Sequence, residues 1–420
     1  MGKSNKKIKK NSKNKLDKKA IKLSKKQIIT IASIFAAVLL LVAAIITVRT
    51  VKKRRADRTV RIAFYGLSEK YVEVLKSKIP VEENIILETD IIASDKFDIG
   101  VVKTKYDMLF TWKGEVTDSL ADASEKISAR VFETMPKSLR DSEKKVIPIL
   151  LDNCEFTYSS DVIKKTASSP DDLPETFEQF KKYLNTAKGY VFSPFFTNGS
   201  DDRILIDLTG AMVMAEYGLS AYKKYIELLK DADSLASVLD VSLSGSDRTL
   251  RNILDEFKLW ASKEQGLTHP AWYIGTDSDL HYFAQSKQIG VFFTLLSRHR
   301  EIPYDIIHNY KSNKVPANAS ASNYGLIAPS ICCMLLTDNA NSKRYVEAFF
   351  TEDAQTELSN LTNLAPVHYR AQAYDRQADD VRYWAASCAG GAMPDIYLAV
   401  YQRKSKELEK ICAEIREYIK

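Results

Sequence analysis

The residue types that usually carry catalysis are scattered along this chain. Its five histidines, at positions 269, 281, 299, 308 and 368, show neither the HExxH spacing nor the paired Cys/His spacing of a zinc site. The five cysteines, at 154, 332, 333, 388 and 412, are odd in number and contain no CxxC pair. They therefore predict neither a disulfide framework nor a metal knuckle, and the adjacent Cys332 and Cys333 are expected to pack as small apolar residues.

Sequence motifs for nucleophilic or nucleotide chemistry are also missing. The chain contains no GxSxG elbow, no GxxxxGK[ST] loop that follows a strand, and no GxGxxG turn. Adjacent carboxylates occur at Asp171–Asp172, Asp201–Asp202 and Asp379–Asp380. Such pairs could serve acid–base chemistry, but in polar turns they are more often helix caps. We therefore expect a protein that is not an enzyme and that needs no cofactor and no metal.

The positive charge of the chain is concentrated in its first 58 residues. This segment holds 18 Lys and Arg against Asp17 and Asp57, whereas residues 59–420 hold 43 basic and 52 acidic residues. The formal net charge of +7 thus describes a tail, and the rest of the chain is mildly acidic. A nucleic-acid partner predicted from the whole-chain charge is excluded on this ground.

Residues 28–48 form an uncharged apolar run of 21 residues, IITIASIFAAVLLLVAAIITV. As a helix, this run is long enough to cross a hydrocarbon core about 30 Å thick. A 27-residue segment with 12 Lys precedes it, which is typical of an uncleaved anchor, although Ala43 and Ala44 leave cleavage as an alternative. Basic residues flank the run equally over 15 positions on each side, and the longer basic tail upstream favours an N-terminus inside the cell.

The predicted organisation of the N-terminal part follows from this pattern. It comprises a basic cytoplasmic tail (1–27), a single transmembrane anchor in the cytoplasmic membrane (28–48) and a basic linker (49–58). The globular body from residue 59 on is then extracytoplasmic.

From residue 59 on, short strand-like runs alternate with helical patterns. Val60–Tyr65 precedes Gly66 as a strand, and Ser68 could cap a following helix. Further strands are predicted at 84–92, 99–102, 108–111 and 146–151, and helices at 118–132, 207–216, 221–229, 248–263, 342–350, 354–361 and 399–418. This alternation predicts α/β layers around a mostly parallel sheet.

Several short segments of the body follow one another in an informative order. They are YDMLFTWKGEVTDS (106–119), IPILLDNCEFTYS (147–159), LPETFEQF (173–180), FAQSKQIGVFF (283–293), 324–329, NSKRYVEAFF (341–350), TEDAQTEL (351–358) and LAPV (364–367). In this order they resemble the extracellular solute-binding proteins of ABC importers, in particular the carbohydrate-type group that includes maltose-binding protein. The segment 147–159 is similar to the family's crossover between lobes, and Phe177 stands at the position of the family's tryptophan.

The resemblance implies a type II periplasmic-binding-protein fold with two α/β lobes, a hinge and a cleft between the lobes. It places 59–155 and 275–325 in lobe 1, and 156–274 and 326–420 in lobe 2. The implied function is the capture of a small solute, a carbohydrate above other solutes, by hinge closure, followed by delivery to an ABC permease.

A sugar site needs flat aromatic faces and a rim of hydrogen-bonding side chains. The aromatic residues predicted to line the cleft lie near strand ends and crossovers: Tyr65, Trp112, Tyr158, Phe196, Trp272 and Tyr273. The alternative is an anionic or amino-acid-like ligand held by Arg298 and Arg300 through bidentate pairing.

The sequence also departs from the family pattern. Ser286 stands where the family has a glycine, and no lipobox cysteine lies near the anchor. These departures favour an alternative function, in which the fold has lost transport and serves as a module for sensing or protein interaction.

Overall fold

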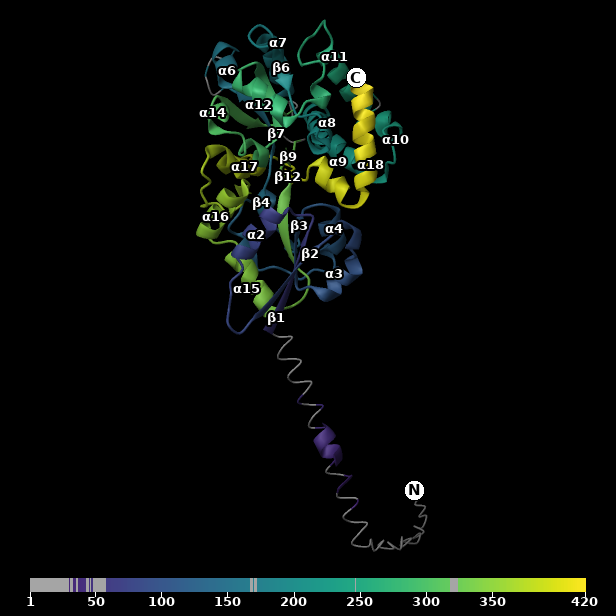
Figure 1. Ribbon diagram of the computed structural model, residues 1–420, viewed down its shortest axis with the longest axis vertical. Coiled ribbons are helices and arrows are strands. Elements are labelled where there is room, and N and C mark those ends of the chain that lie inside the picture. The colour runs from purple at the N-terminus through teal and green to yellow at the C-terminus, as the bar shows by residue number, and fades with distance from the viewer. Residues whose placement is uncertain are drawn as a thin grey trace, which may run out of the picture. The chain divides into compact units, whose positions relative to one another are not determined.

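The computed structural model describes residues 30, 33–34, 37–42, 45, 47, 58–166, 169, 172–245, 247–317 and 324–420. Residues 59–420 form one compact unit, distinct from residues 1–58 (Figure 1). The described residues of the predicted anchor are helical, and its other positions, like the tail 1–27 and residues 49–57, lie outside the described part. Among the described residues, no helix combines the length and the apolar character needed to cross a membrane.

The first lobe is built on a six-stranded sheet in the order β11-β4-β10-β3-β1-β2. Its strands are β1 (Thr59–Tyr65), β2 (Ile86–Ile92), β3 (Met108–Trp112), β4 (Val146–Leu151), β10 (Ser330–Leu335) and β11 (Ala365–Pro366). Strand β1 runs parallel to β2 and β3, and β10 runs antiparallel to β3 and β4. Helices on both faces bury the apolar side chains of the sheet.

The helices of the first lobe divide between the two faces of this sheet. Core residues of α2 (Glu69–Ser77), α15 (Ala340–Ala348) and α16 (Glu352–Thr362) pack with Phe64 and Phe110. Core residues of α3 (Ile99–Lys105) and α4 (Glu115–Ala121) pack with Tyr65 and Leu109 on the other face. Shorter elements are η1 (Ser94–Lys96), α5 (Ala129–Phe132) and η2 (Lys137–Leu139).

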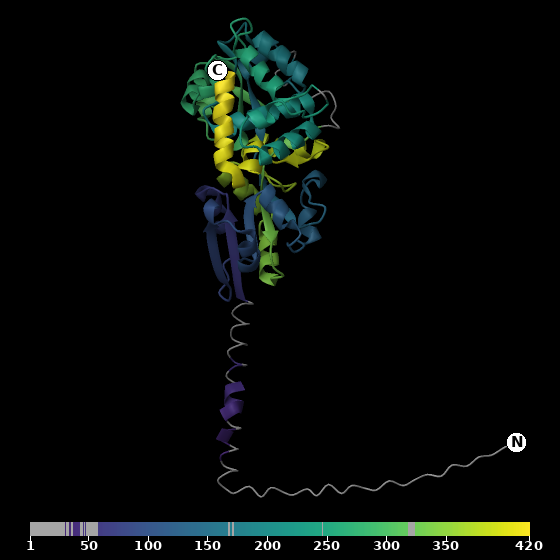
Figure 2. The same ribbon diagram turned by 90° about the vertical axis from the view of Figure 1, so that its right-hand side faces the viewer.

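The second lobe holds a four-stranded sheet in the order β6-β7-β5-β8. Its strands are β5 (Cys154–Ser159), β6 (Ser193–Phe196), β7 (Ile289–Leu295) and β8 (Tyr310–Lys314). Its helices are α6 (Ser160–Thr166), α7 (Phe177–Ala187), α8 (Asp202–Tyr217), α9 (Leu219–Asp231), α10 (Ala236–Leu239), α11 (Leu250–Ala261), η3 (Trp272–Ile274), α12 (Asp277–Gln285), α13 (Leu296–His299) and α14 (Tyr304–Ile307). The C-terminal helix α18 (Ile396–Ile419) packs on α8, α9 and α11, where Figure 2 shows it in yellow.

Short elements connect the two lobes. They are α17 (Arg376–Ser387) and a small parallel ladder of β9 (Leu326–Ile327) and β12 (Ala392–Met393). The α/β class predicted from the alternation of strands and helices is confirmed. The strand pairing is more mixed than the predicted mostly parallel sheet, because β10 and β11 in the first sheet and β5 in the second pair antiparallel with their neighbours.

Helix caps explain several element boundaries. Thr176 and Gln179 form a capping box at the start of α7, and Thr276 and Asp279 form another at the start of α12. The Asp98 side chain accepts a hydrogen bond from Val101 N at 2.8 Å and so begins helix α3. The strand predicted at 99–102 was therefore wrong, because this cap starts a helix there. The helix predicted at 118–132 is divided into α4 and α5.

The predicted lobe boundaries need correction. Strands β7 and β8 both pair with β5, so that residues 289–314 belong to the sheet of the second lobe. Strand β10 pairs with β3 and β4, and β11 pairs with β4, so that residues 330–366 belong to the sheet of the first lobe. The prediction that residues 275–325 belong to lobe 1 was therefore wrong, and so was the prediction that residues 330–366 belong to lobe 2. Both errors have one cause, because a strand's partners can lie far away in the sequence and local patterns do not indicate them.

Candidate functional site

The lobes join where two chain crossings run side by side. The chain leaves the first sheet at the end of β4, passes through Asp152 and Asn153, and enters the second sheet at β5. It returns through Pro329 to β10, and Asp152 N donates a hydrogen bond to Pro329 O at 2.8 Å. At this junction between the two sheets the crossing segments are hydrogen-bonded to each other, and polar side chains gather around them.

Asp152 is a fully buried carboxylate at the junction between the two sheets. Its Oδ1 accepts from the backbone N–H groups of Asn153 and Ser297, each at 3.0 Å, and its Oδ2 accepts from Ser297 Oγ at 2.7 Å. Burial raises the pKa of the Asp152 carboxyl, while Arg203 and the bonds from Ser297 act in the opposite direction. Asp152 thus ties the end of β4 to the segment that follows β7.

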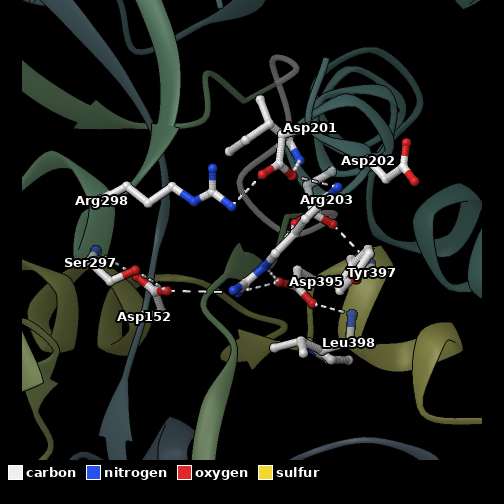
Figure 3. A network of polar contacts seen from close by, with 12 residues as sticks. Asp152, Asp201, Asp202, Arg203, Ser297, Arg298, Asp395, Tyr397 and Leu398 are labelled. Carbon is white, nitrogen blue, oxygen red and sulfur yellow. Dashed lines mark hydrogen bonds and ion pairs between the residues drawn. The ribbon is translucent and has the colours of Figure 1, made fainter. Parts of the chain in front are cut away.

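Arg203 is the centre of the polar network at the junction (Figure 3). It lies in the first turn of α8, and its Nε and a terminal nitrogen donate to Asp395 Oδ2 at 3.1 and 2.8 Å. The carboxylates of Asp207 and Asp152 lie 3.6 and 3.7 Å from the guanidinium. All three carboxylates are buried, so one guanidinium faces three acids.

This imbalance alters the proton affinities of the groups. Burial lowers the pKa of the Arg203 guanidinium, but Asp395, Asp152 and Asp207 together raise it, so the group stays charged. Burial and the neighbouring Asp395 raise the pKa of the Asp207 carboxyl well above its ordinary value. The Asp207 pKa rises because two carboxylates at close range resist simultaneous ionisation.

Other contacts at the junction cross directly from lobe to lobe. The guanidinium carbon of Arg203 lies 5.8 Å from the ring centroid of Trp112, the last residue of β3. Tyr71 packs edge-on against the same indole at 5.9 Å and is hydrogen-bonded to Ser297, and burial raises the pKa of its hydroxyl. Lys70 on α2 pairs with Glu301 at 3.2 Å. Together these contacts hold the lobes against each other.

The rim of the network is partly exposed. Arg298 pairs with Asp201 at 2.7 Å, and about 30% of each side chain is accessible (31% and 27%). Asp201 also caps α8, as its carboxylate accepts from the N–H groups of Arg203 and Ile204. Asp202 pairs with Arg416 of α18 at 2.7 Å. The carboxylate pair at 201–202 is therefore a helix cap and an ion-pair partner, as such pairs usually are.

A cavity of about 370 Å³ opens in the first lobe close to the junction. Its lining includes Lys113, which follows Trp112, and Ala392 of β12. The remaining lining is largely polar: Thr117, Asp118, Ala121, Ser138, Leu139, Arg140, Asp141, Ser142, Glu143, Val146, Pro148, Ser330 and Cys332. Its volume lies at the lower end of the range of small-molecule sites, roughly 300–1,000 Å³.

The aromatic residues predicted as ligand contacts lie mostly in the core. Of these six, only Tyr273 is partly exposed, and only Trp112 contacts the Arg203 network. Tyr65 packs on Phe97, Tyr158 on Phe180 and Tyr183, Phe196 on His269 and Phe283, and Trp272 on Phe195 and Phe257. Contact of these residues with a solute stays a prediction.

The sequence reasoning missed the main polar residues of the junction. Arg203, Ser297 and Asp395 carry no motif, because they come together from three distant parts of the chain. Asp152 did have a signal, since it is the aspartate of the crossover segment IPILLDNCEFTYS. Arg298 was expected as a possible anion ligand, and in this structure it pairs with Asp201.

Comparison with known proteins gives matches at the level of structure. No protein-family profile matches the chain, and no curated protein matches it in sequence. A bacterial solute receptor, AcbH, described as preferring β-D-galactopyranose, superimposes with a TM-score of 0.64 at 11% identity, over 86% of this chain and 96% of that one. A putative binding protein, MsmE, of Bacillus subtilis subsp. subtilis str. 168, in an open conformation, gives a TM-score of 0.63 at 12% identity, over 86% and 93%.

A chitin oligosaccharide binding protein gives a TM-score of 0.53 at 14% identity, over 86% of this chain and 98% of that one. Identities this low establish the fold and not the ligand. The resemblance to solute-binding proteins of the maltose-binding type is thereby confirmed for the fold, and the chain has the two-lobed fold of the bacterial solute receptors.

Proposed function

We propose that this chain is a solute-binding protein that captures a small solute, a carbohydrate above other solutes, between its two lobes by hinge closure. The observation that carries the proposal is the agreement over the whole body with sugar receptors, over 86% of this chain and 96% of one such receptor at a TM-score of 0.64. A ligand that touches both lobes binds the closed state better than the open one and shifts the population toward it.

The chemistry of the junction supports this proposal. The guanidinium of Arg298 and the carboxylate of Asp201 are accessible at the rim, and both can exchange hydrogen bonds with sugar hydroxyls. Trp112 lies at the same junction, where its buried ring contacts Arg203 and Tyr71, and Lys113 lines the adjoining cavity. Such accessible charged groups, which can hydrogen-bond to hydroxyls, suit a small polar solute.

The anchoring and the transport partner are part of the same proposal. Residues 28–48 would hold the protein in the cytoplasmic membrane, with the tail 1–27 inside and the body outside. The closed body would then deliver its solute to the transmembrane subunits of an ABC permease. The apolar run and the short basic linker 49–58 support this arrangement.

A second candidate function is a module that has lost transport and serves sensing or protein interaction. One observation favours it. Arg203 and Arg298 are already paired with carboxylates of the chain itself, and five of the six aromatic residues predicted for the cleft are buried. A solute would have to compete with these internal contacts.

Thermal unfolding of residues 59–420 distinguishes the two functions. This segment has its own core and is one compact unit, so it can be studied alone. The panel comprises monosaccharides, oligosaccharides, amino acids and short peptides. A solute present at 100 times its dissociation constant stabilises the fold by about 2.7 kcal/mol.

A shift confined to one solute class would support the receptor function and name the solute. Arg298→Ala should then reduce the shift, whereas Arg376→Ala, at a side chain that is 93% exposed on α17, should retain it. Cooperative unfolding with no shift from any solute would overturn the receptor function in favour of the second candidate.

A further inference from the structure

Strand β2 forms an open edge of the first sheet. It is the last strand in the sheet order, and within the described residues only β1 pairs with it. Three large apolar side chains on this short strand are exposed: Ile86 (40%), Leu87 (36%) and Ile91 (57%). Natural proteins usually shield such an edge with charge, proline or a covering element, because its free backbone groups and apolar side chains invite another strand.

The sequence of β2 is close to a chemical palindrome. Read in either direction from Thr89, ILETDII places an acid next, then a branched apolar residue, then isoleucine. An antiparallel partner of the same sequence, centred on Thr89, therefore sets Leu87 opposite Ile91 and Ile86 opposite Ile92. Each apolar residue meets an apolar residue, which is the arrangement that stabilises cross-strand pairs.

The two acids of the strand would otherwise oppose this pairing, since Glu88 would face Asp90 of the second copy. Each acid already has a cation within its own chain. Arg61 Nε lies 3.2 Å from Glu88, and Lys105 Nζ lies 2.8 Å from Asp90, whose carboxylate also accepts from the Tyr106 hydroxyl at 2.8 Å. The acids of this edge are therefore neutralised by cations of their own chain, and its apolar residues match those of a second copy.

The register within the sheet keeps the two faces consistent. Leu87, Thr89 and Ile91 pair with Val60, Ile62 and Phe64 of β1, which are core residues on the α2 side of the sheet. In the antiparallel arrangement, Leu87 and Ile91 of both copies lie on this same face. Ile86 and Ile92 of both copies lie on the face covered by α3.

We propose that β2 pairs with β2 of a second copy of this chain, antiparallel about a two-fold axis at Thr89, so that the two first-lobe sheets join into one. A two-fold contact of this kind is complete with two copies, because the open β2 edge of each copy is then paired with that of the other. The proposal concerns a surface away from the Arg203 network and goes beyond solute capture.

Disulfide cross-linking tests the register. All five native cysteines are buried, so a new surface cysteine reacts against a low background. Opposed residues in antiparallel strands have Cα atoms about 4.5–5.5 Å apart, which is within the reach of a disulfide. Thr89→Cys in residues 59–420 should therefore form a covalent dimer on mild oxidation, reversed by reductant. Leu259→Cys, at a position that is 46% exposed in the second lobe, should not.

Sedimentation velocity over a range of protein concentrations measures the non-covalent dimer. Ile91→Lys places a charge at two sites of the symmetric contact and should raise the dimer dissociation constant about tenfold or more. Leu259→Lys is the matched control and should leave the constant unchanged.

Three outcomes would overturn the proposal. They are a monomer at every concentration, a dimer unaffected by Ile91→Lys, and cross-linking at position 259 as strong as at position 89. None of these readouts involves a solute, so a failure here is separable from a failure of the receptor function.

Discussion

The guanidinium of Arg203, on helix α8 of the second lobe, lies over the ring of Trp112, which ends strand β3 of the first lobe. The guanidinium carbon is 5.8 Å from the ring centroid, a distance at which a cation is attracted to an aromatic face. The same guanidinium is paired with the buried Asp152 and Asp395. One side chain therefore contacts both lobes and the crossing segment at Asp152, which makes it the first target for mutation.

Arg203→Ala should destabilise residues 59–420 by about 3 kcal/mol or more, because it leaves Asp152, Asp207 and Asp395 buried without their cation. Urea unfolding checks this value. Without Arg203, whose charge lowers the pKa of Asp152 and Asp207, these two buried carboxyls should hold a proton more tightly in the folded state, so the loss should be larger at pH 8 than at pH 5.

Arg203→Lys keeps the charge but loses the two-nitrogen contact with Asp395, and should lie between the native protein and Arg203→Ala. Arg376→Ala removes an exposed pair and should change the free energy of unfolding by less than about 0.5 kcal/mol. Equal effects of Arg203→Ala and Arg376→Ala would contradict the central role of Arg203.

Tryptophan fluorescence should report events at the junction. Among the four tryptophans of the chain, Trp260 and Trp272 are core residues of the second lobe, and Trp384 lies on α17. A solute that enters between the lobes should alter the emission of Trp112, because it changes the position of the Arg203 charge over the indole. Titration with a solute identified by thermal shift measures this change.

Trp112→Phe should abolish that fluorescence change, and Trp384→Phe should retain it. A change that survives in Trp112→Phe would place the solute elsewhere in the molecule.

Glu216 should make the stability of the protein depend on pH. Burial and a hydrogen bond with Glu256 raise the pKa of Glu216 from 4.5 to about 8. Between these pH values the folded protein keeps a proton that the unfolded chain has released, so the free energy of unfolding falls as pH rises from about 4.5 to about 8. Glu216→Gln should flatten this slope and stabilise the protein at pH 8 by roughly 1 kcal/mol, a value discounted for partial solvation.

Glu178→Gln is the control for this measurement, since its carboxylate is 86% exposed beside Lys181. The free energy of unfolding of this variant should change with pH between pH 5 and pH 8 as it does in the native protein. A Glu216→Gln variant with an unchanged slope would contradict the raised pKa of Glu216.

Gly199 leaves no room for a side chain in the loop that leads into α8. A Cβ there would lie 2.5 Å from the Tyr273 Cα and 2.6 Å from the Trp272 carbonyl oxygen. Gly199→Ala should therefore push this loop away from residues 272–273 and cost about 1–3 kcal/mol in thermal unfolding. Gly189→Ala is the matched control, because its Cβ would meet only an ordinary contact at 3.5 Å, and it should be tolerated.

Local patterns in the sequence determined much of the scaffold. The alternation of strands and helices and the capping box of Thr176 with Gln179 follow from residues close together in the chain, whereas the crossover that contains Asp152 was implied by the family resemblance. Their physics is local, because side-chain periodicity and capping hydrogen bonds act within one or two turns. The separation of a basic tail from a mildly acidic body also follows from the residue order alone.

Only the tertiary structure decided which strands share a sheet and which side chains meet at the junction between the lobes. Strands β5 and β7 pair although they are more than a hundred residues apart in the sequence. Arg203 and Asp395, which form an ion pair, are separated by even more residues. Aromatic residues at strand ends, such as Tyr158 and Trp272, were equally suited by pattern to a cleft or to a core, and packing placed them in the core. Burial and ion pairing depend on what the rest of the chain brings to a site, and local sequence does not contain that information.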